Sequence, residues 1–282
     1  MPDHPSSGGD WTRLPFAEQI AFFRQKLGNL VPTERWDDML GEAHDHGFMV
    51  AGAMEADLLA DLAAATDKAI AEGRGIEAFR KDFKAIVAKH GWTGWTGEGS
   101  KRGEAWRVKT IYQTNSYTSY AAGRFAQLTQ GNFALWVYRH GGALEPRVMH
   151  LAWNGLTLPP DHPFWTVYYP PSDWGCSCYV VGARSAAGAK RLGGDPARKL
   201  GPDWRKPDPK TGRPVGVGKG WGYAPGASVA GMVAALARKL EKWPALIGAG
   251  FWETVSAAQR IRLADDFSDF VQKALSGPAR GN

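Results

Sequence analysis

The residues best suited to chemistry are concentrated in one short stretch of the sequence. Within about thirty residues it holds two cysteines, two histidines and two aspartates, namely Cys176, Cys178, His150, His162, Asp161 and Asp173. Thiolates, imidazoles and carboxylates in this number can complete a tetrahedral zinc site. The spacing is less favourable, because zinc-binding cysteine pairs usually enclose two to four residues and this pair encloses one. The alternative is that both thiols pack as small apolar side chains near the end of a strand.

Two catalytic interpretations of the same stretch are also open. Either cysteine, together with His150 or His162, would form a thiol–imidazole pair for nucleophilic catalysis. His140 and His150 with Arg147 would suit phosphoryl chemistry in a nuclease. The sequence has no recognisable nucleophile turn or oxyanion loop, and a histidine beside apolar residues is more often structural. We therefore predict that the chain is not an enzyme and has no catalytic residues.

Positive charge is concentrated between residues 184 and 220. This stretch carries ten basic and three acidic side chains, whereas residues 1–75 carry six basic and thirteen acidic ones, within a net charge of +6. A basic stretch can lie along a phosphate backbone, and the alternative is a solvated loop that charge keeps soluble. Its Gly-rich part is not a P-loop, because Gly220 follows Lys219 where that motif needs Ser or Thr. The predicted nucleic-acid contacts are Arg184, Lys190, Arg191, Arg198, Lys199, Arg205, Lys206, Lys210, Arg213 and Lys219.

The composition is typical of a folded protein without a membrane span. The chain has 282 residues, of which 44% are hydrophobic and 12% aromatic, enough for one large domain or two modest ones. No apolar run approaches the roughly 20 residues that cross a bilayer, and the N-terminus lacks the pattern of a secretory signal. We therefore expect no membrane contact and folding in the cytoplasm. Cys176 and Cys178 are too near each other in sequence for an unstrained disulfide.

Helical patterns dominate the first half of the chain. Two of them are separated only by a short loop with Gly73 and Gly75, so they should form an antiparallel hairpin. In all, helices are predicted over 16–27, from the N-cap Thr33 to Leu40, over 54–70 and 76–87, and from Trp106 to about Gln130.

The second half combines short strands with irregular segments. Apolar and aromatic runs typical of strands occur at 134–138, 166–169 and 178–181. Periodicity is weak over 184–226, which indicates an extended arm, and two helices are predicted from Ser228 and from near Thr254. The predicted fold class is α+β, with a short antiparallel sheet in a small irregular core. The predicted domains are 1–96 (helical), 97–183 (α+β core), 184–226 (basic Gly/Pro-rich arm) and 227–282 (C-terminal helices).

Several motifs, taken in order, resemble those of the phage Mu F-like family of minor head proteins. Each is weak alone, but together they are specific and span residues 15–226. The first are Pro15–Lys26, Thr33–Asp38, His44–Gly52 and Ile76–Phe83 with Gly91-Trp92. The middle ones are Arg147 with His150–Gly155, His162–Trp165, Pro170-Pro171 and Trp174–Cys178, and the closing one is Gly220–Gly226.

The resemblance implies which residues matter for the fold and for a metal. The core motif of the fold would consist of Arg147, His150, Asn154, Gly155, His162, Pro163, Trp165, Pro170, Pro171 and Trp174. Some members of the family carry a fuller set of Cys and His that is suggestive of zinc. In this chain the matching positions leave His150, Asp173, Cys176 and Cys178. The resemblance therefore implies either a zinc site or a polar group that only fixes the fold, and no other cofactor is expected.

The resemblance also implies a function. We expect a minor head protein of a tailed bacteriophage or prophage, assembled in the host cytoplasm and retained inside the capsid of the virion. The portal protein, the capsid or scaffold interior and the packaged DNA would be its partners. The alternative is a DNA-binding or nuclease-like protein that uses the His/Cys cluster and the basic arm.

Overall fold

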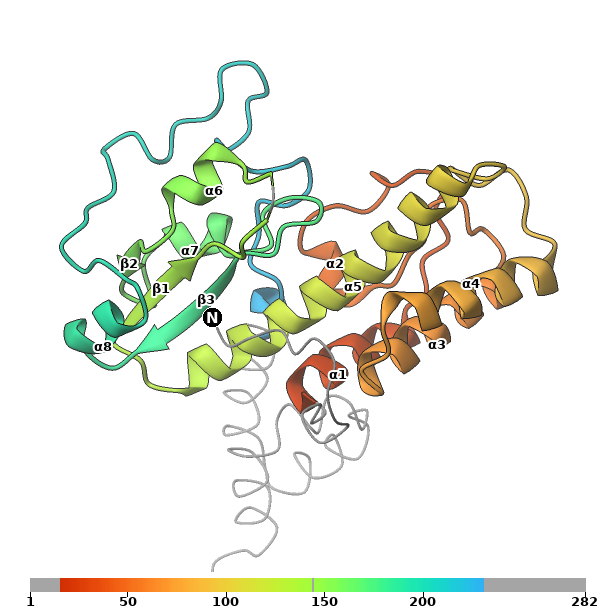
Figure 1. The fold of residues 1–282 in the computed structure, drawn as a ribbon, viewed down its shortest axis with the longest axis horizontal. Coiled ribbons are helices and arrows are strands. Elements are labelled where there is room, and N and C mark those ends of the chain that lie inside the picture. Colours follow the sequence, from red (N-terminus) through yellow and green to blue (C-terminus); the bar gives the residue numbers. More distant parts are fainter. Residues whose placement is uncertain (1–15, 144, 231–282) are drawn as a thin grey trace, which may run out of the picture.

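The computed structural model describes residues 16–143 and 145–230 (Figure 1). The predicted helical hairpin is present, because α3 and α4 lie side by side. Leu58, Leu59 and Leu62 bury one face of α3, and Gly91 in the left-handed conformation ends α4. The helices before α5 are α1 (Ala17–Arg24), the 3-10 helix η2 (Gln25–Gly28), α2 (Ala43–His46), α3 (Ala56–Ala71) and α4 (Ile76–His90).

One long helix, α5 (Lys101–Gln130), crosses the molecule (Figure 1). Ser100 caps its N-terminus, because the Ser100 hydroxyl oxygen accepts a hydrogen bond from the Gly103 N–H at 3.0 Å. Val108 and Ile111 lie in a core cluster with the helices of the N-terminal half. Further along the same helix, Leu128 lies in a second cluster with the sheet. The predicted domain boundary near residue 97 lies just before α5, and this helix contributes to both cores.

The sheet has three antiparallel strands in the order β2-β1-β3. β1 (Leu135–Arg139) is central, β2 (Thr157–Leu158) pairs with it on one side and β3 (Tyr179–Ala183) on the other. Val137 lies opposite Thr157 in β2 and Val181 in β3. The predicted α+β class with a short antiparallel sheet is therefore confirmed, and the predicted strands at 134–138 and 178–181 correspond to β1 and β3.

The strand predicted at 166–169 is wrong, because the chain forms the short helix α7 (Phe164–Tyr168) there. Phe164, Trp165 and Tyr168 are all buried, and their spacing places them on one face of a helix. An aromatic run of this length does not distinguish a strand from a buried helical turn. A second short helix, α6 (Val148–Ala152), precedes it.

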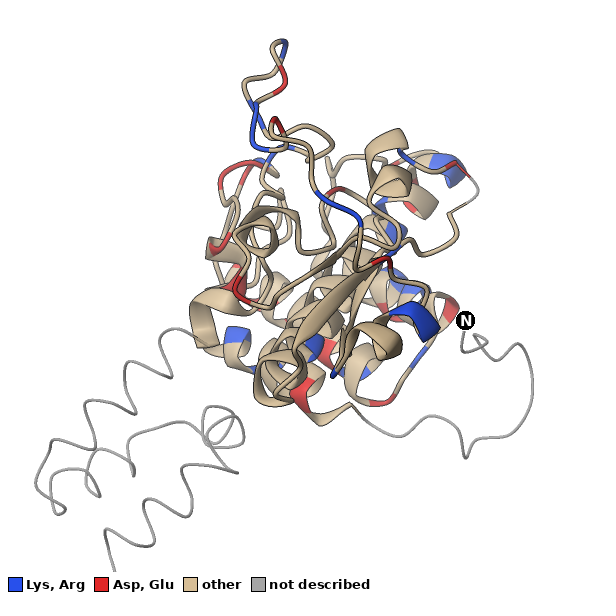
Figure 2. Ribbon diagram, turned by 90° about the vertical axis from the view of Figure 1, so that its left-hand side faces the viewer, with Lys and Arg blue, Asp and Glu red and all other residues tan. Residues whose placement is uncertain are grey.

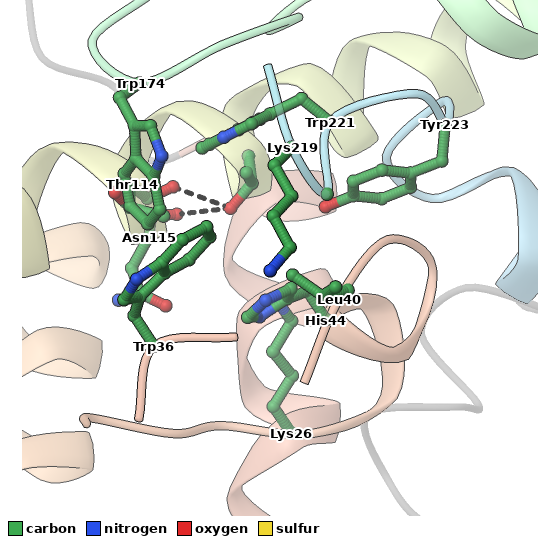
Figure 3. A pocket seen from close by; sticks show the side chains of 12 residues that line it. Lys26, Trp36, Leu40, His44, Thr114, Asn115, Trp174, Lys219, Trp221 and Tyr223 are labelled. Carbon is green, nitrogen blue, oxygen red and sulfur yellow. Dashed lines mark hydrogen bonds between the residues drawn. The ribbon is translucent and has the colours of Figure 1, made fainter. Parts of the chain in front are cut away.

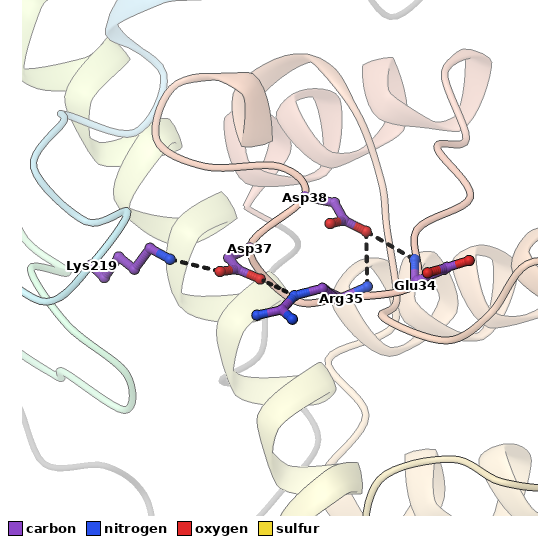
Figure 4. A network of polar contacts seen from close by, with 5 residues as sticks. All are labelled: Glu34, Arg35, Asp37, Asp38 and Lys219. Atoms are coloured by element: carbon purple, nitrogen blue, oxygen red, sulfur yellow. Dashed lines mark hydrogen bonds and ion pairs between the residues drawn. The ribbon is translucent and has the colours of Figure 1, made fainter.

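The helix predicted from Thr33 to Leu40 is also wrong, because this segment forms turns. The Asp38 carboxylate accepts hydrogen bonds from the backbone N–H groups of Glu34 and Arg35, at 2.9 and 2.8 Å (Figure 4). A side chain that satisfies these donors stabilises a turn in place of a helix. We call residues 33–41 the N-terminal loop.

The basic segment 184–226 contains one helix, α8 (Ala186–Arg191), and is otherwise irregular. It is not an arm that extends away from the protein along its whole length. Val217, Trp221 and Ala224 are buried in the second core cluster, and Trp204 packs against it. The aromatic residues of the segment therefore complete a core, while most of its charged residues are exposed.

Residues 218–230, which we call the closing segment, return to the N-terminal half. The Gly41 N–H donates to the Gly220 carbonyl at 3.1 Å. The buried Asp45 carboxylate accepts from the Gly226 N–H at 2.9 Å and from the Ser228 hydroxyl at 2.7 Å. Of the two predicted C-terminal helices, the first begins within the described residues, where 227–230 are helical, and the rest of both lies outside them. No helix in the described part of the chain is both long and apolar enough to cross a membrane.

Candidate metal centre

Three of the predicted ligands converge between α6 and the start of β3. The Nδ1 atom of His150 and the Sγ atoms of Cys176 and Cys178 all lie within 4.8 Å of one another. Nδ1 is 3.5 Å from the Cys176 sulfur and 3.8 Å from the Cys178 sulfur. His150 and Cys176 are buried, and Cys178 is partly buried. Cys176 and Cys178 follow His150 by 26 and 28 positions in the sequence, and the three side chains form one compact cluster.

The orientation of His150 leaves a lone pair facing the two sulfurs. Its Nε2 lies 2.8 Å from the Gly216 carbonyl oxygen, which can only accept a hydrogen bond, so Nε2 carries the proton. In the neutral ring Nδ1 is then an acceptor. Trp153 stacks on the imidazole, with ring centroids 5.6 Å apart, and holds its plane. A donor from the second ring nitrogen to a carbonyl is the usual support of a metal-binding histidine.

Asp173, the fourth predicted ligand, does not join this group. Its Oδ2 is 2.8 Å from Arg147 Nε, and its Oδ1 accepts from the Trp174 N–H at 2.8 Å. Arg147 also donates to the Trp174 carbonyl at 2.8 Å. The Asp173–Arg147 pair therefore links the start of α6 to the turn that leads to Cys176. Neither side chain is part of the cluster, but both help to position it.

A buried tyrosine completes the surroundings of the sulfurs. Tyr138, on the central strand, is fully buried, and its hydroxyl has no hydrogen-bond partner of ordinary geometry among the described residues. Burial raises the pKa of Tyr138 well above its usual value, and negative charge on Cys178 or Cys176 raises it further. The hydroxyl therefore remains protonated and is available as a donor beside the cluster.

The two thiols have different acidities. Their mutual hydrogen bond lowers the pKa of Cys178, and interactions with His150, Tyr138 and the Gly141 backbone act in the same direction. The same hydrogen bond and burial raise the pKa of Cys176. Cys178 is therefore the thiol that becomes a thiolate first, and metal binding would require the second proton to leave as well.

The donor set and the two nitrogen–sulfur distances fit a zinc ion. Ordinary Zn–N and Zn–S bonds at tetrahedral angles place nitrogen and sulfur about 3.6 Å apart. The two Nδ1–Sγ distances of 3.5 and 3.8 Å agree with that value. The same distances also suit thiol-to-imidazole hydrogen bonds. Zinc held by these three side chains would need a fourth ligand, and the Tyr138 hydroxyl lies close to the Cys178 sulfur.

The predicted fold-motif residues surround this centre and join its elements. Asn154 Oδ1 accepts from the His140 N–H at 3.0 Å, and the Gly155 N–H donates to the Tyr138 carbonyl at 2.8 Å. Around α7, His162 Nδ1 accepts from the Phe164 N–H, Pro163 is the N-cap residue and Trp165 donates to the Pro159 carbonyl at 2.9 Å. Pro170 and Pro171 are buried between α7 and the Asp173 turn.

The residues of the predicted nuclease site are otherwise engaged. His140 Nδ1 accepts a hydrogen bond from the Gly142 N–H at 3.1 Å, within a local turn. Arg147 is paired with Asp173, and His150 faces the sulfurs. These three side chains therefore have separate structural contacts.

The ten predicted nucleic-acid contacts do not form one uniform group. Lys and Arg are spread over several loops and helices, with acidic residues between them (Figure 2). Three of the ten have internal partners: Arg198 donates to the Asn154 carbonyl at 3.2 Å and to that of Ala152, Lys206 pairs with Asp203, and Lys219 pairs with Asp37. Arg205 lies over the Trp204 ring, and Arg213 is partly buried. The remaining five are exposed: Arg184, Lys190, Arg191, Lys199 and Lys210.

Sequence reasoning missed three contributors to the centre, which are Tyr138, Gly141 and Gly216. The sequence pattern places Tyr138 in a strand and indicates no contact with the cysteines. Gly141 and Gly216 act through their backbones, and an ideal Cβ on Gly216 would lie 2.7 Å from the Met149 Cβ. The sequence does hold one indication of such contacts, because glycine is the residue that allows a backbone to approach other groups this closely.

Comparison with known proteins shows that the region around the cluster matches a protein family. Residues 60–181 match the family described as Phage Mu protein F like protein, and they include α4, α5 and all three side chains of the cluster. No solved structure matches the chain.

Two curated relatives extend the match. The chain is 35% identical over 191 residues to the "Putative capsid assembly protein F" of Escherichia phage Mu, covering 64% of this chain and 43% of the relative. It is 31% identical over 234 residues to the "Mu-like prophage FluMu F protein" of Haemophilus influenzae, covering 74% of this chain and 56% of the relative. The chain thus spans about half the length of each relative. The resemblance seen in the sequence is confirmed, and the chain belongs to the phage Mu F-like family.

Proposed function

We propose that this chain is a head-assembly protein of a tailed bacteriophage or prophage, present as a minor head protein in the capsid interior. The observation that carries the proposal is the match to the relative from phage Mu, whose name describes capsid assembly. The proposed role is structural and not catalytic. His150 and Cys176 are only 2% and 3% exposed, so a substrate would not reach these two side chains.

The portal protein is the proposed partner, and the acidic N-terminal half is the proposed contact surface. Many of its carboxylates already serve the fold, as Asp67 does with Arg24 and Asp61 does with Lys89. Glu42, Glu55 and Asp57 are exposed and have no ion pair within the described residues. These three side chains lie near the starts of α2 and α3 and can meet a basic partner.

Co-purification with the portal protein and with procapsids tests this proposal. We expect the wild-type chain to travel with both after gradient separation of particles from cells that produce the other head proteins. The triple variant Glu42→Gln, Glu55→Gln, Asp57→Asn should lose most of the portal-bound fraction, because electrostatic complementarity guides such encounters. Asp161→Asn with Asp203→Asn is the control, since both residues are exposed outside that half. A wild-type chain found free of portal and procapsids contradicts the proposal.

Contact with packaged DNA is the second part of the proposal. Its support is the exposed basic residues Lys190, Arg191, Lys199 and Lys210 in and after α8, which form no ion pair among the described residues. Such residues neutralise phosphates without reading sequence.

A bound zinc ion is the third part, with a structural role. His150, Cys176 and Cys178 come from α6 and from the approach to β3, so one ion would join two elements with little regular packing between them. Zinc at such a site contributes directly to folding free energy.

A further inference from the structure

A pocket lies where the N-terminal loop, α5 and the closing segment meet (Figure 3). We call it the tryptophan pocket, and the lining residues used below are Lys26, Trp36, His44, Trp174, Lys219 and Trp221. The space in and above it, including open solvent at the mouth, is about 420 Å³. It is separate from the His/Cys cluster, because none of the cluster's three side chains lines it.

The pocket has cationic groups and no carboxylate. Among the described residues that line it, none is Asp or Glu, whereas Lys26 and Lys219 both reach into it (Figure 3). Lys26 is only 2% exposed, which is unusual for a lysine. His44 is neutral at pH 7, because burial and the nearby Lys26 charge lower its pKa to about 4. The lining side chains themselves therefore carry positive charge, which the neighbouring Asp37 and Asp45 carboxylates offset in part.

Indole rings form the apolar walls. Trp36 packs edge-on against Trp174 with centroids 5.7 Å apart, and Trp174 packs likewise against Trp221 at 5.2 Å. Trp36 and Trp174 are still 40% and 39% exposed, so the rings are accessible at the mouth. The Lys219 ammonium lies 5.1 Å from the centre of the Trp36 ring. A cation thus stands directly beside exposed aromatic surface.

The Lys219 ammonium has more N–H groups than it has hydrogen-bond acceptors among the described residues. Its ammonium carries three N–H groups, and within the described residues Asp37 is its hydrogen-bond acceptor, at 2.6 Å (Figure 4). Arg35 holds the other oxygen of Asp37 at 3.1 Å. The ammonium is therefore anchored at the pocket mouth, with its other N–H groups available to a second acceptor.

We propose that the tryptophan pocket binds a carboxylate carried on a small apolar group. Lys219 would receive the carboxylate, and the indoles would cover the apolar part. Two sources have this chemistry: a free small carboxylic acid, and the C-terminal residue of a partner polypeptide. A strongly hydrated phosphate matches the indole walls less well, because its surroundings would have to replace its water on all sides.

Titration calorimetry with propionate on the full-length chain tests the site, with chloride at equal ionic strength as reference. We expect saturable 1:1 binding of propionate to the wild type and to Lys206→Met, whose lysine is exposed and outside the pocket. Lys219→Met should bind at least about tenfold more weakly, as the loss of a hydrogen bond to a charged group predicts. Phosphate should bind more weakly than propionate in all three proteins.

A second measurement does not depend on the lysine variant. Iodide quenches exposed tryptophan fluorescence, and as an anion it should enter the same pocket. Propionate should therefore reduce the iodide quenching of the wild-type chain, but leave quenching by neutral acrylamide less affected. No saturable propionate binding, equal binding by Lys219→Met, or tighter binding of phosphate would each overturn the proposal.

A peptide comparison separates the two sources. A short peptide that ends in leucine with a free carboxylate should displace propionate if a polypeptide C-terminus fits, and its C-terminal amide should not. If propionate binds and neither peptide competes, the site takes a free small acid.

Discussion

At the scale of single residues, the orientation of His150 determines whether the His/Cys cluster can bind a metal ion. The hydrogen bond to Gly216 fixes the proton on Nε2, so Nδ1 can accept either a thiol proton or a metal ion. These two states have the same side-chain arrangement and differ in whether both thiols are deprotonated. A direct measurement of metal binding therefore separates them.

Zinc binding by the wild-type chain should be stoichiometric and should require His150. Competition with a coloured chelator is the measurement, and His150→Ala should weaken binding at least about 100-fold, because loss of even an outer partner costs 10–100-fold. Zinc should also protect both thiols from a thiol reagent, and this readout is clean because the chain has two cysteines.

The matched control for this experiment is His140→Gln, since His140 lies outside the cluster and serves a local turn. It should bind zinc as the wild type does. Wild-type thiols that react at the same rate with and without zinc would show that the cluster is held by hydrogen bonds alone.

His44 should make the protein less stable in acid. Its folded pKa is lowered to about 4, chiefly by burial, while an unfolded histidine titrates near 6.5. Between these values the unfolded chain binds a proton that the folded chain does not. The contribution of His44 is thus fully present above about pH 6.5 and is lost as the pH falls toward 4.

Urea unfolding at pH 7 and at pH 4.5 measures this effect. The loss of unfolding free energy on acidification should be smaller in His44→Gln than in the wild type, by up to about 1.4 kcal/mol per pH unit. His46→Gln, at an exposed neighbour, should retain the wild-type loss. Equal losses in wild type and His44→Gln would assign the acid sensitivity to other groups.

Much of the candidate site could be predicted from residue types, but not its partners. Cys176, Cys178 and His150 stand out in the sequence because few side chains bind metals. The acceptor for His150 is a backbone carbonyl, which every residue has, so the sequence gives no sign that Gly216 supplies it. Asp173 looked like a ligand because its type was suitable, and only the geometry shows its pairing with Arg147.

At the scale of secondary-structure elements, α1 packs tightly against α5 at Gly123. A Cβ at this position would lie 2.8 Å from the backbone nitrogen of Gln19 and 2.8 Å from the Phe16 ring. Backbone atoms cannot move aside as a flexible side chain can. Glycine is therefore required inside a long helix, where alanine would otherwise be preferred by about 1 kcal/mol.

Gly123→Ala should destabilise the protein by about 1–3 kcal/mol, because overpacking outweighs the gain in helix propensity. Urea unfolding measures it. Gly188→Ala in α8 is the control, since its nearest neighbour would be the Ser185 side-chain oxygen at 3.3 Å. That variant should be neutral or slightly more stable. A stability gain in Gly123→Ala would mean that α1 can shift away from α5.

The elements with long periodic patterns were predictable, and the short ones were not. The α3–α4 hairpin follows from leucine spacing and two glycines, which act locally. α7 and a strand of five residues would both bury Phe164 and Tyr168, so tertiary packing decides between them. The turn at residues 33–41 depends on Asp38 as a local acceptor and on contacts with the distant closing segment.

At the scale of the whole molecule, charge is unevenly distributed along the chain but intermixed in space. Asp37 and Lys219 illustrate this, because an acidic N-terminal residue neutralises a basic one from the closing segment. The positive charge that is left for DNA is therefore smaller than the sequence suggests, and it lies mainly around and after α8.

The affinity for DNA should fall as the salt concentration rises. The steepness of this fall should decrease when basic residues of α8 are replaced. Lys190→Gln with Arg191→Gln should reduce the slope of log affinity against log salt by about 2, as the loss of two phosphate contacts predicts. Lys68→Gln with Lys81→Gln makes the same change in net charge on exposed residues of α3 and α4 and should leave the slope unchanged. Equal effects of the two variants would indicate attraction by net charge alone.

The contact between Asp45 and the closing segment has a consequence during synthesis. The carboxylate and the Gly226 N–H that it accepts from are 181 residues apart. At 5–20 residues per second, the ribosome needs about 10–35 s to make the intervening chain. For most of that interval the N-terminal helices are outside the ribosome while Asp45 still lacks its hydrogen bonds to Gly226 and Ser228. A nascent chain stalled before residue 226 should therefore be more sensitive to protease around α2 than the released protein.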